Sequence, residues 1–184
     1  MPKKVETLHD NEWLSLKKLV YPERHVDGYV YSHETRCNGK IISILPFRRE
    51  EGIIQYLLRD EVTPCWEIEK SVVSSITGGY EKEKGVKGTV VLELKEEAGY
   101  TVKEDELISL GTCRGTKSTD SVYHLFSVDL TGKKQREAKG DGSVLEAKAK
   151  CFWSLDLGQC EDPFAFVSYY RLNQKFIEKL YQRY

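Results

Sequence analysis

The sequence predicts an α+β fold, and three of its features lead to this prediction. Short β-rich runs are spread along the chain, two segments have the apolar periodicity of helices, and the order is several strands, one helix, several strands, one helix. A mixed order of this kind favours a sheet flanked by helices. The 184 residues, 40% of them hydrophobic, are enough for one core and therefore for one globular domain.

The first region of the chain combines an ambiguous segment with a clear strand candidate. Residues 13–20 place apolar side chains at roughly helical spacing before Pro22, so we expect a short helix or an arm that packs on the body. Residues 28–36 alternate apolar and polar side chains, which is typical of a half-buried strand.

The remaining chain predicts a hairpin, two helices and further strands. Residues 40–47 and 53–59 flank a charged stretch that ends at Gly52, which predicts an antiparallel hairpin. Within residues 85–100, Val90, Val91 and Leu94 have helical offsets and Gly99 stands at the expected C-terminal stop, which predicts a helix of about three turns. A second helix is predicted to begin at Pro163. The other strand candidates are residues 71–77, 107–113, 121–130 and 147–155.

Composition argues against several classes of protein. The 28 basic and 29 acidic residues give a net charge of −1 without long blocks of one sign, so nonspecific nucleic-acid binding has no support. No stretch approaches the roughly 18 apolar residues that span a membrane, and the first residues lack an apolar signal segment. The five scattered cysteines lack a C-x-x-C pair, so we expect reduced thiols in a cytoplasmic protein.

Three carboxylates near the end of the first predicted helix are the strongest chemical signal. Because each helical residue advances about 100°, Glu93, Glu96 and Glu97 share one face. Their mutual repulsion and the helix macrodipole both disfavour this cluster. A hard divalent cation such as Mg²⁺ reverses that balance because it prefers carboxylate oxygens. The alternative interpretation is an ordinary solvated acidic face.

The run from Gly78 to Tyr100, "GGYEKEKGVKGTVVLELKEEAGY", resembles the Nudix box, G-x5-E-x7-R-E-U-x-E-E-x-G-U, in which U is bulky and apolar. The second half of the pattern matches at Glu93, Leu94, Glu96, Glu97, Gly99 and Tyr100. The first half departs, because Lys84 stands at the first glutamate position and Leu92 at the arginine position. In the family that arginine helps to hold the metal-binding glutamates.

The resemblance covers roughly residues 28–182 and implies a Nudix-like α/β/α sandwich with a mixed sheet, a Nudix loop-helix-loop and a C-terminal helix. We therefore expect an N-terminal arm or helix at residues 1–27 and a Nudix-like domain at 28–184. The implied activity is Mg²⁺-dependent hydrolysis, with Mn²⁺ as another possible ion, of the pyrophosphate bond in a nucleoside diphosphate derivative. ADP-ribose and nucleotide sugars are the first substrates to test.

Two other functions stay open at this point. Lys84 and Leu92 favour a catalytically weakened Nudix-fold module that binds a nucleotide or has a regulatory role. A plain α+β domain with an incidental acidic helix is the third possibility. The resemblance also implies a homodimer, for which the aromatic region from Trp13 to Tyr31 is a suitable interface.

The resemblance implies roles for individual residues. Glu93, Glu96 and Glu97 would bind the metal with a backbone carbonyl of Gly78 or Gly79, and Glu93 and Glu97 are the principal ligands. Catalysis also needs a proton acceptor. The assignment is Glu146, in a glycine-containing loop, with Asp141 and Asp120 as weaker candidates.

Substrate contacts are assigned to four residues: Arg59, Tyr80, Arg114 and Lys117. Arg59 follows the second hairpin strand, and its alternative is an exposed strand-end charge. Arg114 and Lys117 lie in a polar loop that can approach a diphosphate. Aromatic rings stack on bases, so Trp66 and Tyr123 are further candidates beside Tyr80, although such rings are more often part of the core or its rim. His124 lies in an apolar run and is interpreted as structural.

Overall fold

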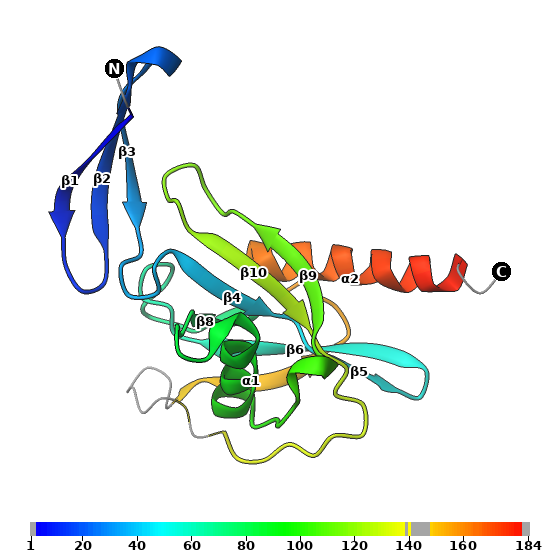
Figure 1. Cartoon of the computed structure of the whole chain (residues 1–184). Helices are drawn as coiled ribbons and strands as arrows, with labels where there is room; N and C mark the ends of the chain where they lie inside the picture. Colours follow the sequence, from blue (N-terminus) through cyan, green and yellow to red (C-terminus); the bar gives the residue numbers. More distant parts are fainter. Residues whose placement is uncertain (1–2, 139, 141–147, 182–184) are drawn as a thin grey trace.

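The computed structural model describes residues 3–138, 140 and 148–181. Within these ranges the chain forms two α-helices and eleven strands (Figure 1). The helices are α1 (Gly85–Ala98) and α2 (Pro163–Tyr181). The strands are β1 (Lys4–Asp10), β2 (Ser15–Tyr21), β3 (Val26–His33), β4 (Lys40–Ile44), β5 (Phe47–Glu50), β6 (Ile53–Glu61), β7 (Val72–Ser74), β8 (Ile76–Gly79), β9 (Ile108–Cys113), β10 (Val122–Ser127) and β11 (Lys150–Ser154).

The body is a sandwich in which strands lie between the two helices. One sheet has the order β8-β4-β10-β9, and a second has the order β11-β6-β5 with β7 paired to β6. Strand β10 is parallel to β4 and antiparallel to β9, so the arrangement is mixed. Helix α1 packs on β8 and β4, whereas α2 packs on β10, β4 and β9. The predicted α+β sandwich with a C-terminal helix is confirmed.

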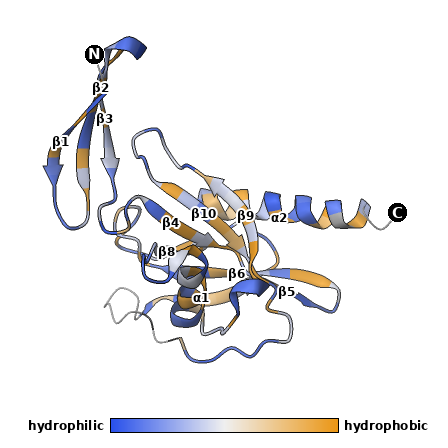
Figure 2. Cartoon of the chain, in the orientation of Figure 1, coloured by the Kyte–Doolittle hydropathy of each residue, from blue (hydrophilic) through white to orange (hydrophobic). Residues whose placement is uncertain are grey.

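Each helix covers its own hydrophobic core. Neighbouring residues of one strand face opposite sides, so Leu57 joins the core under α1 while Leu58 joins the core under α2. Leu125 and Phe126 of β10 divide in the same way. Burial of both faces explains why these strands are continuous apolar runs rather than alternating ones. Figure 2 shows the apolar residues concentrated in the strands between the helices.

Helix α1 forms where the sequence predicts it, because Val90, Leu94 and Ala98 recur at helical spacing and are fully buried. Gly99 ends the helix in the left-handed conformation with φ 72°. A Cβ atom at Gly99 would also lie 2.0 Å from the carbonyl oxygen of Arg136. Position 99 therefore requires glycine for two reasons: the left-handed backbone conformation and the lack of space for a Cβ atom.

Two predicted strands are each divided in the structure. Residues 40–47 break at Leu45 and Pro46 into β4 and β5, and residues 71–77 break at Ser75 into β7 and β8. In both cases the chain passes from one sheet of the body to the other. The predicted hairpin is confirmed as β5 and β6, joined by Glu51 and Gly52, both with positive φ.

The N-terminal region corrects one prediction. Residues 13–20 do not form a helix, because residues from Ser15 onward belong to strand β2 of a three-stranded sheet β1-β2-β3. This sheet stands beside the body rather than within it (Figure 1). Strand β3 crosses the expected boundary at residues 27 and 28, and the division into two parts stays a prediction.

The second half of the chain agrees with the predicted element order. Strands β9, β10 and β11 lie at the predicted positions, and α2 begins at Pro163. Within the described ranges, neither helix is both long and apolar enough to cross a membrane.

Candidate functional site

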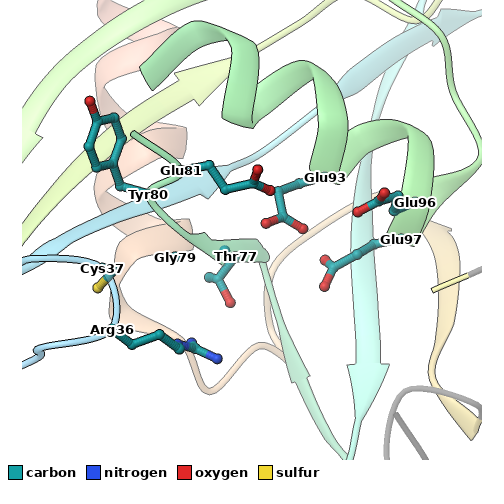
Figure 3. Close-up of a pocket in the computed structure, with 10 residues that line it drawn as sticks. Arg36, Cys37, Thr77, Gly79, Tyr80, Glu81, Glu93, Glu96 and Glu97 are labelled. Carbon is teal, nitrogen blue, oxygen red and sulfur yellow. The ribbon is translucent and has the colours of Figure 1, made fainter. Parts of the chain in front are cut away.

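A cavity of about 300 Å³ lies between α1 and β8 (Figure 3). Helix α1 contributes Glu93, Glu96 and Glu97, so the three predicted carboxylates do share one wall. The loop between β8 and α1 adds a fourth carboxylate, Glu81, that the sequence did not single out. The other lining residues are Arg36, Cys37, Thr77, Gly78, Gly79 and Tyr80.

Thr89 fixes the loop that carries Glu81. The backbone N–H of Glu81 donates to Thr89 Oγ1 at 3.1 Å, and that hydroxyl donates to the carbonyl of Gly85 at 2.8 Å. Lys84 pairs with Glu81 at 3.1 Å, although both side chains are substantially exposed. The loop is therefore tied to the first turn of α1, and Glu81 extends toward Glu93 in Figure 3.

Gly78 is needed because the Glu93 side chain occupies the space beside it. A Cβ atom at Gly78 would lie 2.0 Å from Glu93 Oε1 and 2.3 Å from its carboxyl carbon. Gly78 belongs to β8 and pairs with Ile42 of β4, so its backbone position is fixed by the sheet. The first glycine of the motif thus allows a carboxylate of α1 to lie directly against the strand.

Arg59 is a buried residue beneath the cavity rather than an exposed charge at the end of a strand. The guanidinium is buried, with 2% of the residue exposed, and its Nη1 lies 3.1 Å from Glu97 Oε2 while its Nε donates to Glu61 Oε2 at 2.7 Å. Burial opposes its charge, but Glu97 and Glu61 raise the pKa of Arg59 above its usual value. Arg59 reaches up from β6 to hold the helix carboxylate, so the alternative of an exposed strand-end charge is corrected, and a contact between Arg59 and a substrate phosphate stays a prediction.

Cys151 completes the support beneath the end of α1. It lies opposite Arg59 in the pairing of β11 with β6, and its Sγ donates to the carbonyl oxygen of Glu97 at 3.5 Å. Burial raises the pKa of the Cys151 thiol to about 12, so the group is neutral at pH 7. Sequence reasoning missed this residue because its role depends on pairing between distant strands.

The donor chemistry of the cavity fits a hard divalent cation. Carboxylate oxygens from α1 and Glu81 face the backbone of the β8 glycines, and oxygens of these kinds are what Mg²⁺ prefers. As the side chains lie, no group of three or more His, Cys, Asp or Glu residues within the described part of the chain is close enough to hold a metal ion.

Arg36 also lines the cavity, and no local pattern in the sequence marks it as a site residue. It follows β3, and Figure 3 shows its guanidinium directed into the cavity from the side opposite α1. A Cβ atom at Gly79 would lie 3.2 Å from Cys37 Cβ and 3.6 Å from Arg36 Nη2. The second glycine of the motif thus allows the turn with Arg36 to approach β8.

The other predicted substrate contacts lie in different places. Tyr80 lines the cavity edge, and its ring points away from the three helix carboxylates in Figure 3. Arg114 and Lys117 do not line this cavity, because their loop extends toward the N-terminal sheet. Arg114 donates to the carbonyl of Asp120 at 2.7 Å, and the Lys117 carbonyl accepts from the Tyr29 hydroxyl.

The aromatic candidates outside the carboxylate cavity also differ from one another. Tyr123 stacks on Phe164 at 3.6 Å between ring centroids, and burial raises its pKa to about 12. This ring is part of the core. Trp66 is 51% exposed and lines a different, smaller cavity. His124 is partly buried, and desolvation together with the charge of Lys40 lowers its pKa.

The proton-acceptor candidates remain predictions. Glu146 and Asp141 lie outside the described residues. Asp120 pairs with His33 Nδ1 at 2.9 Å and does not line the carboxylate cavity.

Comparison with known proteins identifies the fold. No family model matches the sequence, and no curated protein matches it. Among solved structures, an ADP compounds hydrolase has a TM-score of 0.65 at 15% identity, covering 96% of this chain and 93% of its own. A protein described as a Nudix hydrolase from Listeria monocytogenes str. 4b F2365 has a TM-score of 0.54 at 18% identity, covering 76% of this chain and 94% of its own. These likenesses confirm the predicted Nudix-like fold.

Proposed function

We propose that this chain, which has the fold of Nudix hydrolases, is a Mg²⁺-dependent pyrophosphohydrolase of nucleoside diphosphate derivatives. The observation that carries the proposal is the cavity in which Glu81, Glu93, Glu96 and Glu97 gather against Gly78, with Glu97 held by the buried Arg59. ADP-ribose is the first substrate to test, because the similar structure named an ADP compounds hydrolase covers nearly the whole chain.

In this proposal the chain's residues have separate roles. Glu93, Glu96 and Glu97 hold Mg²⁺ with a carbonyl of Gly78 or Gly79, and Mn²⁺ suits the same oxygen donors. The ion supplies neutralisation of phosphate charge and activation of a water. Arg59 fixes the rotamer of Glu97, and Arg36 faces the diphosphate from the opposite wall. Glu146 accepts the proton of the attacking water.

The departures at Lys84 and Leu92 do not favour a purely binding role. Leu92 replaces the motif arginine, but the buried Arg59 of β6 supplies a guanidinium to Glu97 at 3.1 Å. Lys84 pairs with Glu81, which brings a carboxylate to the cavity from a neighbouring loop position. The charges that the motif lacks in its own sequence are thus supplied by other residues.

The test measures release of AMP from ADP-ribose, and of the nucleoside monophosphate from nucleotide sugars, with Mg²⁺ and with EDTA. We expect the substrate to be cleaved in the presence of Mg²⁺ and not in the presence of EDTA. Glu93→Gln and Glu97→Gln should each lower kcat by roughly 10²-fold or more. Glu83→Gln, an exposed carboxylate of the same loop that does not line the cavity, is the matched control and should retain activity.

Two outcomes decide the proposal. Because Glu97→Gln leaves the Arg59 charge with one carboxylate fewer, its thermal unfolding is measured beside its rate. Glu93→Gln does not alter the Arg59 pair and is the safer variant. Wild-type turnover by both variants, or equal turnover in EDTA, contradicts the proposal.

We also propose that the protein is a cytoplasmic homodimer. All five cysteines are free, which suits a reducing compartment. The N-terminal sheet and its β1–β2 connection expose large apolar side chains, namely Val5, Leu8, Trp13, Leu14, Leu16, Tyr29 and Val30. Apolar surface of this kind supports an interface with a second copy.

A further inference from the structure

A second cavity adjoins the carboxylate cavity and has the opposite charge. Its volume is about 350 Å³, and it is lined by Arg36, Cys37, Asn38, Lys40, Tyr80 and Lys82. Three of the residues, Arg36, Cys37 and Tyr80, line both cavities, so the two cavities are adjacent. The described lining of the first cavity has four carboxylates and one cation, whereas that of the second has three cations and no carboxylate.

A tight turn fixes the position of the basic residues. The N–H groups of Asn38, Gly39 and Lys40 donate to the carbonyls of Thr35, Glu34 and Cys37, at 3.2, 2.9 and 3.1 Å. The N–H of Tyr80 donates to the Lys40 carbonyl at 3.0 Å, which joins the turn to the end of β8. The second cavity is therefore built on backbone hydrogen bonds between two segments that are 40 residues apart in sequence, at Lys40 and Tyr80.

Aromatic rings hold two of the cations. Lys40 Nζ lies 4.8 Å from the centroid of the Tyr80 ring, and the Arg36 guanidinium lies 5.6 Å from that of Trp13. No ion pair joins Arg36, Lys40 or Lys82 to a carboxylate in the described part of the chain. Among the described residues, no ion pair with a carboxylate therefore neutralises these three charges.

The chemistry of the lining selects an anion. Arg36 offers a planar fork of donors, and the lysines offer compact ammonium charges, which together suit phosphate or carboxylate oxygens. The Asn38 amide adds neutral donors, and the Tyr80 ring supplies a flat apolar wall. The nearby His124 is consistent with this field, because burial and the charge of Lys40 both lower its pKa.

We propose that this basic cavity binds an additional anionic group, a phosphate or a carboxylate, carried by the part of the substrate beyond the pyrophosphate. The inference rests on the proposed function and narrows its substrate class to nucleoside diphosphate derivatives with such a group. Because Arg36 borders both cavities, it contacts the diphosphate side and the added anion of the same molecule.

The experiment compares matched compounds that differ by one anionic group. ADP-ribose against its 2′-phosphate tests the phosphate, and UDP-glucose against UDP-glucuronate tests the carboxylate. For at least one pair, we expect kcat/KM to be about tenfold or more higher for the member with the added anion, because charge-assisted hydrogen bonds are of that strength. The pair that shows the preference identifies the group.

Variants connect the preference to the cavity. Lys82→Gln and Lys40→Gln should each reduce the ratio of kcat/KM within the preferred pair by about fivefold or more. Lys87→Gln removes an exposed lysine of α1 that does not line either cavity, and the ratio should stay at the wild-type value. Raising the salt concentration from 50 to 500 mM should shrink the ratio in the wild type because the basic residues are partly exposed.

Calorimetric binding separates this inference from the proposed function. If no compound is cleaved but the added anion lowers Kd and Lys82→Gln removes the difference, the basic cavity is supported and the hydrolase proposal fails. If compounds are cleaved while both members of both pairs have equal kcat/KM and equal Kd, the inference is overturned and the hydrolase proposal stands. An unchanged preference in both lysine variants also overturns it.

Discussion

At the scale of single residues, Arg59 and Leu92 show how a guanidinium can reach a helix carboxylate from a distant strand. Leu92 stands where the Nudix pattern has arginine, and Arg59 of β6, 33 residues earlier in the chain, lies 3.1 Å from Glu97. Arg59 is buried and pairs with both Glu61 and Glu97, so removing a partner leaves a buried charge with less compensation. The sequence showed the missing arginine but not its replacement.

The ion pair between Arg59 and Glu97 leads to a prediction that Arg59 positions the Glu97 carboxylate for catalysis and does more than stabilise the fold. Arg59→Met should lower kcat by about tenfold or more and reduce the free energy of unfolding by about 3 kcal/mol. Arg59→Lys keeps a charge without the fork and should recover part of kcat. Adding Leu92→Arg to Arg59→Met places a cation one turn from Glu96 and should also recover part of the rate.

Steady-state kinetics and urea unfolding of the same preparations check this prediction. Arg59→Lys and the double variant with Leu92→Arg separate a positioning role from a purely structural one. If Arg59 only stabilised the fold, kcat in every variant would change only in proportion to the fraction of folded protein. Arg59→Met with the wild-type kcat would show that Glu97 does not need the guanidinium.

At the scale of elements, the sequence predicted α1 and the β5-β6 hairpin because both are determined by residues that are close to one another in the sequence. The apolar spacing and Gly99 define α1, and Gly52 defines the hairpin turn. For residues 13–20 the helix alternative is wrong, because their apolar spacing suits a helix while pairing with β1 and β3 fixes a strand. The crossings at Pro46 and Ser75 depend on how the two sheets pack, which local periodicity does not encode.

The same distinction applies to the site. Glu93, Glu96 and Glu97 were predictable because one helical repeat places them on one face. Arg36, Arg59 and Cys151 arrive from other strands and turns, so only the tertiary structure brings them to α1. Glu81 lies in a loop of alternating charges, where no local pattern distinguishes it from its solvated neighbours.

The start of α2 yields a stability prediction at this scale. Asp162 is 1% exposed, and its carboxylate accepts from the N–H of Phe164 at 2.8 Å, the N–H of Ser75 at 3.2 Å and the Ser75 hydroxyl. It therefore caps α2 and ties the helix to the crossing between β7 and β8. Asp162→Ala should reduce the free energy of unfolding by about 2 to 4 kcal/mol.

Guanidinium unfolding at equilibrium measures this loss. Asp156→Ala is the matched control, because Asp156 accepts one backbone N–H, from Gly158 at 2.7 Å, in an exposed turn. The control should lose less than about 1 kcal/mol. Equal losses in the two variants would mean that Asp162 does not join α2 to the sheet.

At the scale of the whole molecule, the N-terminal sheet and the body meet beside the proposed site. Ser32 and Ser118 join them by a backbone hydrogen bond of 2.8 Å, and Arg36 lies between Trp13 and the two cavities. The sheet thus borders the region where the substrate would bind. An interface formed by this sheet would connect assembly with the shape of the basic cavity.

The proposed homodimer is tested through the exposed apolar residues of the N-terminal sheet. Val30 lies on β3 and is 45% exposed, so Val30→Lys would place a charge inside an interface that uses this sheet. We expect sedimentation equilibrium to show a dimer for the wild type and a weakening of at least about tenfold for the variant. Ile68→Lys, at a site 67% exposed and outside this sheet, should leave the dimer unchanged. A monomeric wild type at 50 µM, or equal association constants for both variants, would rule out this interface.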